Sequence, residues 1–256
     1  MIAISQIGNP RSGFRMGNSL FLYCTAKKIA QRLGTELLIP KTWIGLQLFD
    51  IEDKIVDDIG IYPNTEFDEI PDRDNINLWG YYQFQKALIY TRQEALSWLK
   101  FKPEVLKAWK RPHDKYVAIH QRLGDYLELS NLYAVPNTMS YYGAIDKAEI
   151  KPDSKIVWVS DGLNGNNDIT DMIKDFLDMA FSDILIRSNS TFSYWAGVLG
   201  NPNKEIYAPQ VSDTIGLASI PFVKGNWPMM ASPKVHGTKL TDLYLDGVDS
   251  IPVEIV

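Results

Sequence analysis

The 256-residue sequence has a single cysteine, Cys24, which excludes an internal disulfide framework and suits a reducing compartment. It has no apolar run near the roughly 20 residues of a membrane span. Its N-terminus has neither the basic region nor the long apolar region of a signal peptide. Lys and Arg number 26 against 31 Asp and Glu, so the basic excess of a duplex nucleic-acid binder is also missing. With three histidines and no close His/Cys cluster, a structural zinc site is not expected. We therefore expect a cytoplasmic protein with no transmembrane segment, no nucleic-acid partner and no metal.

What the chain does have is enough apolar sequence for a core and an uneven distribution of charge. It is 45% hydrophobic and 22% charged, which excludes whole-chain disorder. From Arg11 to Lys41 there are six basic residues and one acid, whereas from Asp50 to Asp74 there are ten acids and two bases. The basic segment either faces an anionic ligand or forms a solvated helix face, and charge alone favours the second interpretation.

Apolar patterns alternate between those of strands and those of helices along most of the chain. This alternation is typical of parallel α/β sheets. Two such series are separated by a polar region and Pro112, so we predict an N-terminal α/β domain at 1–112 and a C-terminal one at 113–256. Residues 210–256 contain four prolines and little periodicity, and no elements are assigned there. The expected strands are 2–7, 35–39, 116–119, 155–159, 183–186 and 205–207, and the expected helices include 22–33, one from Thr91, one from Pro103, 169–177 and 191–199.

Three segments contain residues suited to phosphate chemistry. Gly13–Asn18 lies between an expected strand and a helix, where backbone N–H groups can point at a phosphate, but a turn with an Asn N-cap explains it equally well. His120–Asp125 lies at the carboxyl end of a strand, where α/β sheets bind ligands, and Arg122 there can hold a pyrophosphate. Ser188–Ser193 precedes a helix and offers hydroxyls and free N–H groups, although capping by Ser190 or Thr191 is the plainer interpretation.

His120 and Asp125 also have alternative interpretations. Asp125 can accept a proton or orient a hydroxyl, and His120 is either a functional group or a buried core histidine. Taken together, the three segments suit one ligand that carries a diphosphate. The aromatic residues Trp43, Trp79, Tyr81 and Tyr82 suit either sugar stacking or core packing.

The order of these segments resembles the α-1,2-fucosyltransferase family of bacteria and viruses, within the GT-B inverting fucosyltransferases. The blocks that carry the resemblance run from about residue 6 to residue 210. They are Gly17-Asn18-Ser19-Leu20-Phe21-Leu22-Tyr23, Gly80-Tyr81-Tyr82-Gln83, Phe101-Lys102-Pro103, His120-Gln121-Arg122-Leu123-Gly124-Asp125-Tyr126, Tyr141-Tyr142, Val159-Ser160-Asp161, Ser188-Asn189-Ser190-Thr191-Phe192-Ser193-Tyr194-Trp195 and Ala208-Pro209.

The resemblance implies a GT-B-like fold, in which two Rossmann-like domains face each other across a cleft. It implies metal-independent transfer of L-fucose from GDP-fucose to a glycan hydroxyl with inversion, and no cofactor. The C-terminal domain would hold the nucleotide and the N-terminal domain the acceptor.

The resemblance also implies roles for individual residues. Arg122 would bind the diphosphate, and Asp125, with His120 second, is the candidate for the base that activates the acceptor. The proposed substrate-binding residues are Gly17, Asn18, Asp161, Ser190, Thr191 and Phe192.

The departures of the sequence from the family pattern include two positions that bear on function. The second arginine of the His-x-Arg-Arg signature is Leu123 here, and a glutamine of the first loop is Ser19. Two alternatives therefore stay open. One is the same scaffold with another donor such as GDP-rhamnose, and the other is a non-catalytic sugar or nucleotide binder.

Overall fold

Two compact units divide the chain between Ala108 and Trp109. The computed structural model describes residues 1–8, 15–83, 87–128, 133–160, 169–211 and 216–226. We call the described residues up to Ala108 unit 1 and those from Trp109 onward unit 2. The acceptor and nucleotide roles of the predicted domains, and a cleft between them, stay predictions.

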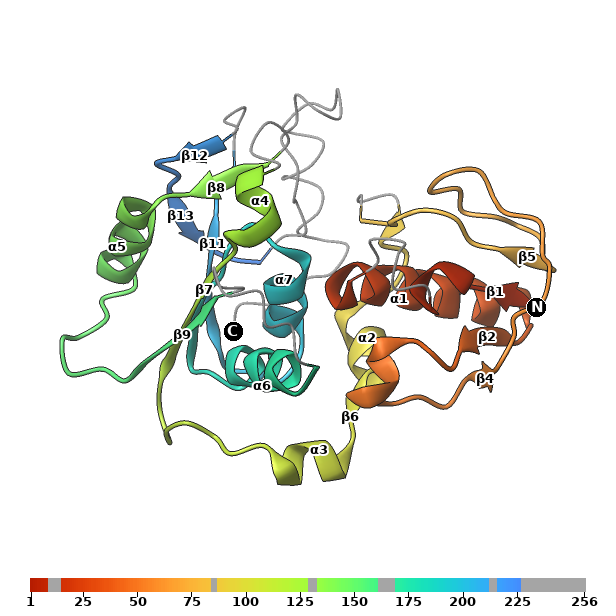
Figure 1. Cartoon of the computed structure of the whole chain (residues 1–256), viewed down its shortest axis with the longest axis horizontal. Coiled ribbons are helices and arrows are strands. Elements are labelled where there is room, and N and C mark those ends of the chain that lie inside the picture. The colour runs from red at the N-terminus through yellow and green to blue at the C-terminus, as the bar shows by residue number, and fades with distance from the viewer. Residues whose placement is uncertain (9–14, 84–86, 129–132, 161–168, 212–215, 227–256) are drawn as a thin grey trace. The chain divides into compact units, whose positions relative to one another are not determined.

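Unit 1 is built on a four-stranded parallel sheet in the order β4-β2-β1-β5. Helix α1 lies along this sheet and packs on β1 and β2 (Figure 1). A two-stranded antiparallel pair, β3 with β6, lies beside it. The elements of unit 1 are β1 Ile2–Ala3, α1 Met16–Leu33, β2 Leu37–Pro40, β3 Phe49–Asp50, β4 Lys54–Val56, β5 Ile76–Asn77, α2 Arg92–Trp98, β6 Lys100–Phe101 and α3 Pro103–Ala108, with 3₁₀ turns at Ser5–Gly8 and Ile44–Gln47.

Local signals in the sequence define the helices of unit 1. Helix α1 ends as predicted at Gly34, which has φ +61°. The Gly34 N–H donates to Gln31 and the Thr35 N–H to Ala30, which is the hydrogen-bond pattern of a Schellman end. The predicted capping box of Thr91 with Glu94 is present at the start of α2.

The predicted strand over residues 2–7 is wrong beyond Ala3. A 3₁₀ turn follows at Ser5–Gly8, because polar groups far away in the sequence bind this segment. The Ser5 N–H donates to Asn77 Oδ1 at 2.9 Å, and Gln6 Oε1 accepts from the Gly80 N–H at 3.1 Å. These contacts replace the sheet hydrogen bonds that a longer strand would make.

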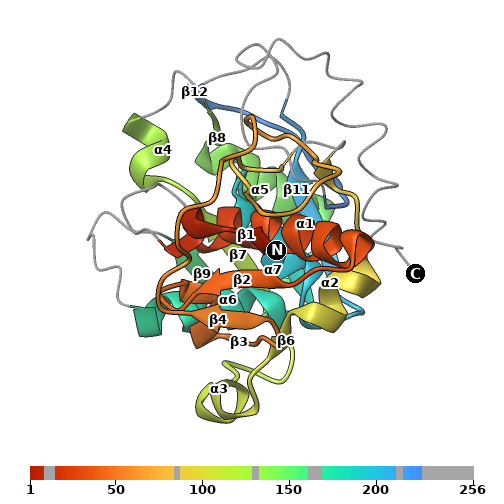
Figure 2. The same ribbon diagram turned by 90° about the vertical axis from the view of Figure 1, so that its right-hand side faces the viewer.

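Unit 2 has a five-stranded sheet in the order β13-β11-β10-β7-β9, parallel except for β13. Helix α5 covers one face of the sheet, and α6 and α7 cover the other (Figure 1; Figure 2 gives a second view). A short parallel pair joins β8 to β12. The elements are β7 Val117–Gln121, α4 Gly124–Glu128, β8 Ala134–Pro136, α5 Thr138–Lys147, β9 Ile156–Ser160, α6 Ile169–Ala180, β10 Ile184–Ile186, α7 Thr191–Val198, β11 Glu205–Pro209, β12 Gly216–Ala218 and β13 Phe222–Lys224.

Lys204 fixes the carboxyl ends of α6 and α7. Its buried ammonium donates to the carbonyl oxygens of Ala180 at 2.6 Å, Ala196 at 2.5 Å and Leu199 at 2.9 Å. A cation at this position satisfies carbonyls that have no partner within the helix and complements the negative end of each helix dipole. Helix α7 is therefore held in a fixed direction on the sheet.

Among the described residues, no helix is both long and apolar enough to cross a bilayer.

Candidate functional site

Two of the three predicted segments meet at the carboxyl edge of the unit 2 sheet. Strands β7 and β10 are parallel neighbours, with Ile119 opposite Ile186. The residues that follow these two positions therefore come close together, His120 near the end of β7 and Arg187 directly after β10, and the Arg187 charge acts on His120. Ser188 Oγ lies 2.7 Å from His120 Nδ1, so a buried hydrogen bond joins the two segments directly.

His120 is a buried neutral imidazole. Its side chain is 2% exposed, and burial together with the nearby Arg122 and Arg187 charges lowers its pKa to about 3. A general base works best when its pKa lies near the working pH. The environment of His120 therefore favours a positioning role, in which the ring holds Ser188 and the start of α7 in place.

The perturbed His120 makes protein stability depend on pH in a defined direction. The neutral form is favoured in the folded state, since the pKa falls from about 6.5 in the unfolded chain to about 3 in the folded protein. This contribution to stability is complete above pH 6.5 and is lost as the pH falls from 6.5 towards 3. At about 1.4 kcal/mol per pH unit, the unfolding free energy should lose about 2 kcal/mol between pH 6.5 and 5.

Urea unfolding of the wild type and of His120→Asn over this pH range checks the expectation. The variant should lack that part of the slope, whereas His113→Asn, at an exposed position, should keep it. Equal slopes in the wild type and His120→Asn would contradict a buried neutral imidazole.

Arg122 follows β7 directly and is partly buried. Its Cζ lies 5.2 Å from the centroid of the Tyr126 ring, which belongs to α4. Tyr126 in turn stacks on Tyr133, with centroids 4.2 Å apart and an interplanar angle of 10°. Packing of the guanidinium on Tyr126, which Tyr133 holds in place, limits its motion, as required of a group that binds an anion in a fixed geometry.

Arg187 is a candidate that the sequence analysis missed. It is fully buried, its Nη1 donates to the Ser188 carbonyl at 3.0 Å, and its Cζ lies 5.7 Å from the centroid of the Tyr194 ring. Its charge and that of Arg122 both act on His120. Two features of the sequence could have identified Arg187. It is a basic residue directly after an apolar strand and next to the serine-rich segment, and the signature motif has Leu123 in place of a second arginine.

The serine-rich segment begins α7 by ordinary capping. Ser190 is the N-cap, and its side chain accepts from the Phe192 N–H at 3.3 Å, as the plainer interpretation predicted. Thr191 is 9% exposed. The Phe192 ring lies 6.1 Å from His120 and 5.2 Å from Phe176 between centroids, so it packs between β7 and α6.

Two predicted residues cannot be placed by their side chains. Asp161 lies outside the described residues. Asp125 belongs to α4, and its side chain lies outside the described part of the structure.

In unit 1, Asn18 lies in the first turn of α1 and does not cap it. The N-cap is Arg15, which makes no side-chain capping bond, so the alternative of an Asn18 N-cap is wrong. Asn18 Oδ1 accepts a hydrogen bond from Gln83 Nε2 at 3.0 Å, and Gly17 beside it is buried. This contact joins the first motif to the Gly80–Gln83 segment.

The backbone before Gln83 has an unusual conformation that its neighbours enforce. Tyr82 is fully buried with φ +53°, and its N–H donates to Asp68 Oδ1 at 2.7 Å. Gly80 has φ +143°, and a Cβ there would lie 2.1 Å from the same Asp68 oxygen. Such a conformation costs about 1–3 kcal/mol at a non-glycine residue, so it persists only where other contacts determine it. Asp68 and Gly80 thus fix the approach of Gln83 to Asn18.

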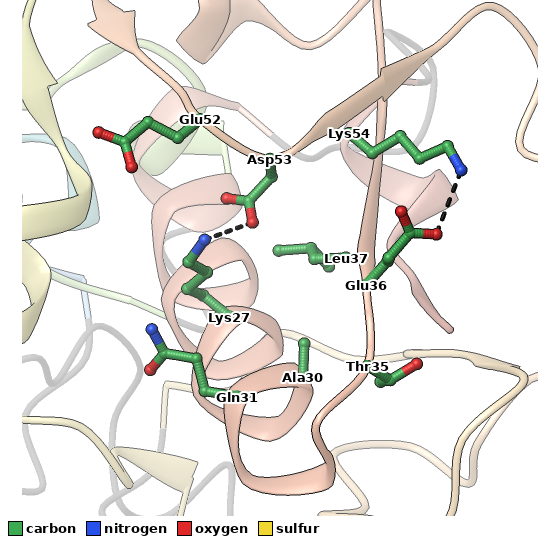
Figure 3. Close-up of a pocket in the computed structure, with 9 residues that line it drawn as sticks. All are labelled: Lys27, Ala30, Gln31, Thr35, Glu36, Leu37, Glu52, Asp53 and Lys54. Atoms are coloured by element: carbon green, nitrogen blue, oxygen red, sulfur yellow. Dashed lines mark hydrogen bonds and ion pairs between the residues drawn. The ribbon is translucent and has the colours of Figure 1, made fainter.

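A separate hollow of about 310 Å³ lies in unit 1 beside the last turns of α1 and the amino ends of β2 and β4 (Figure 3). Its two lysines pair with acids of the same lining, Lys27 with Asp53 and Lys54 with Glu36, the latter at 3.1 Å. The remaining acid, Glu52, pairs with Lys100 at 3.3 Å. This hollow therefore has no excess of positive charge for a diphosphate. Among the described residues, no group of three or more His, Cys, Asp or Glu side chains could hold a metal ion.

No protein-family model matches the chain, and no curated protein matches it either. Solved structures of similar fold do exist. The fucosyltransferase NodZ from Bradyrhizobium aligns with a TM-score of 0.52 and 15% identity over 88% of this chain and 98% of NodZ. The NodZ α-1,6-fucosyltransferase soaked with GDP-fucose aligns with a TM-score of 0.51 and 14% identity over 88% of this chain and 99% of the other.

A third structure, NodZ co-crystallised with GDP, gives a TM-score of 0.52 at 14% identity over 88% and 98% of the two chains. At these identities the likeness concerns the fold. The predicted α/β, GT-B-like fold class with parallel sheets is confirmed.

Proposed function

We propose that this chain is a glycosyltransferase that moves L-fucose from GDP-fucose to a glycan hydroxyl. The observation that carries the proposal is the carboxyl edge of β7 and β10, where the charges of Arg122 and Arg187 both act on His120, which is hydrogen-bonded to Ser188 just before α7. The likeness to NodZ supports it, since structures of that fucosyltransferase were obtained with GDP-fucose and with GDP.

The chemistry of this edge suits a departing nucleoside diphosphate. Breaking the sugar–phosphate bond leaves an oxocarbenium-like sugar and an anionic leaving group, which needs positive charge and N–H donors where the negative charge develops. Arg122 binds the diphosphate with its planar fork of donors, and the N–H groups at the start of α7, near Ser190 and Thr191, add to the positive field. Phe192 packs against the same site. No metal is required by this arrangement.

Arg187 supplies the second positive charge that the signature lacks at Leu123. A buried guanidinium next to His120 raises the electrostatic potential at the sheet edge without contacting solvent, and the low dielectric strengthens that field. The cost of burying this charge is consistent with a functional role, because buried charges rarely add to stability.

The other proposed roles come from the resemblance and rest on it. Asp125 accepts the proton of the acceptor hydroxyl, and inversion follows if the acceptor attacks from the face opposite GDP. His120, the second candidate from the sequence, takes the positioning role that its burial favours. Asp161 contacts the donor. Gly17 and Asn18, at the start of α1, approach the phosphates from the N-terminal domain, and Gln83 holds the Asn18 side chain in position.

A donor panel tests the proposal. The purified chain is incubated with GDP-fucose, GDP-rhamnose, GDP-mannose and UDP-galactose, with and without EDTA and uncharged oligosaccharide acceptors. We expect release of GDP from GDP-fucose and insensitivity to EDTA. NMR of the product gives the anomeric configuration and the linkage. The linkage is to be measured because the motifs resemble α-1,2-fucosyltransferases, whereas NodZ is named an α-1,6-fucosyltransferase.

Turnover of another GDP-sugar alone would replace the donor in the proposal. Calorimetric binding of GDP without turnover of any donor would identify a non-catalytic binder. Absence of both binding and turnover would reject the site.

A further inference from the structure

Three aromatic side chains of unit 1 remain on the surface. Phe67 is 57% exposed, Trp79 42% and Tyr81 37%, whereas Trp43 and Tyr82 are in the core. We call Phe67, Trp79 and Tyr81 the aromatic platform. The sequence left open whether these aromatic residues stack on sugars or pack in the core. Core packing accounts for Trp43 and Tyr82, but it does not account for the platform.

Ring contacts and backbone hydrogen bonds hold the platform rigidly. The Phe67 and Tyr81 rings meet edge to face, with centroids 5.9 Å apart and an interplanar angle of 73°. The backbone N–H of Asp68 donates to the Trp79 carbonyl at 2.9 Å, and the Trp79 N–H donates to Thr65 Oγ1 at 3.0 Å. Asp68 and Thr65 are both buried. The exposed rings therefore stand on a fixed frame and are not at the tip of a free loop.

Backbone strain is concentrated in the same frame. Asp68 has φ +57°, Gly80 +143° and Tyr82 +53°. For the two residues that are not glycine, Asp68 and Tyr82, this conformation costs stability and persists only where the surrounding contacts enforce it, and such residues cluster at binding sites. Here the positive-φ residues alternate with the exposed aromatic ones, so that the frame is buried and the rings face outward.

The charge around the platform disfavours an anionic ligand. Glu66 and Glu69 flank Phe67 and Asp68, within a stretch from Asp50 to Asp74 that contains ten acids and two bases. This field repels a nucleotide or phosphate. Carboxylates accept hydrogen bonds from hydroxyls, and aromatic faces pack on the C–H face of a pyranose ring, so the surface fits an uncharged saccharide.

We propose that the aromatic platform binds the acceptor, an uncharged pyranose-containing glycan; this rests on the function proposed above. Within unit 1 the platform is linked to the first motif, because Tyr81 lies two residues before Gln83, whose side chain donates a hydrogen bond to Asn18 at the start of α1. A sugar stacked on the rings adds binding energy remote from the reacting bond and orients the acceptor hydroxyl.

The test compares a double variant, Phe67→Ala with Tyr81→Ala, with the wild type. Acceptor KM and kcat are measured with GDP-fucose and uncharged oligosaccharides that end in galactose, glucose or N-acetylglucosamine. We expect the acceptor KM to rise at least about tenfold, while acceptor-independent hydrolysis of GDP-fucose continues. Ile61→Ala, at an exposed apolar position of the same unit, is the matched control and should behave as the wild type.

Tyr81→Phe keeps the ring and removes the hydroxyl, so it separates stacking from hydrogen bonding and should retain most of the acceptor affinity. An unchanged acceptor KM in the double variant would overturn the proposal, and so would an equal loss of GDP-fucose hydrolysis. Urea unfolding of each variant shows that it is folded.

Failure of the proposed function is distinguishable from failure of the platform. Should the wild type transfer no sugar, saturation-transfer NMR with the same oligosaccharides still measures their binding. Binding by the wild type that the double variant loses would support the platform alone. Absence of binding by the wild type to every oligosaccharide, or equal binding by both proteins, would overturn it.

Discussion

Replacing Arg122 by alanine should lower fucosyl transfer by about 10²–10³-fold and leave the protein folded. The guanidinium lies at the carboxyl end of β7, packed on Tyr126, where it can stabilise the charge that develops on the departing GDP. Loss of one preorganised donor raises the barrier most when the site excludes water. The substitution removes a partly buried side chain at the sheet edge, so the unfolding free energy should change little.

Two further variants sharpen this measurement. Arg122→Lys keeps the charge but loses the bidentate fork, so it should fall between the wild type and Arg122→Ala. Arg111→Ala is the matched control, because Arg111 also packs over a tyrosine ring in unit 2, with its Cζ 5.5 Å from the centroid of Tyr116. Near-wild-type turnover by Arg122→Ala would reject the role assigned to this residue.

Replacing Arg187 by methionine should weaken GDP binding at least about tenfold and lower transfer by roughly 10²-fold. Methionine fills much of the same volume without the charge, so packing against Tyr194 is largely kept. The hydrogen bond to the Ser188 carbonyl is lost, but a buried charge is also removed, and these two effects on stability have opposite signs. We therefore expect a loss of function that exceeds any loss of stability.

His120 gives an independent readout of the same substitution. Arg187 is one of the charges that lower the His120 pKa, so that pKa should rise in Arg187→Met when it is followed by NMR of the imidazole C–H signals. Adding Leu123→Arg to Arg187→Met tests the replacement directly, since it restores a second arginine at the signature position. Partial recovery of GDP affinity is expected. Wild-type GDP affinity in Arg187→Met would show that Arg187 serves packing alone.

The helix ends and most strands of both units were predictable because their signals are local. Gly34 ends α1 by adopting a left-handed conformation, Thr91 and Glu94 cap α2, and Pro103 begins α3. Each of these depends on residues within one turn of each other. The strand predicted over 2–7 was wrong beyond Ala3, because two hydrogen bonds between partners more than 70 residues apart determine that segment, one from the Ser5 N–H to Asn77 and one from the Gly80 N–H to Gln6.

The sequence by itself determined the identity and order of the segments that we propose bind the diphosphate, since their residue types and positions relative to strands follow from the chain. Only the tertiary structure places Arg187 near the segment that contains Arg122. The pairing of β10 with β7 brings residue 187 close to residue 120, on which both arginine charges act. The tertiary structure also decided which aromatic side chains face solvent. Apolar periodicity cannot distinguish Tyr81 from Tyr82, whereas the hydrogen bonds of Asp68 turn one outward and bury the other.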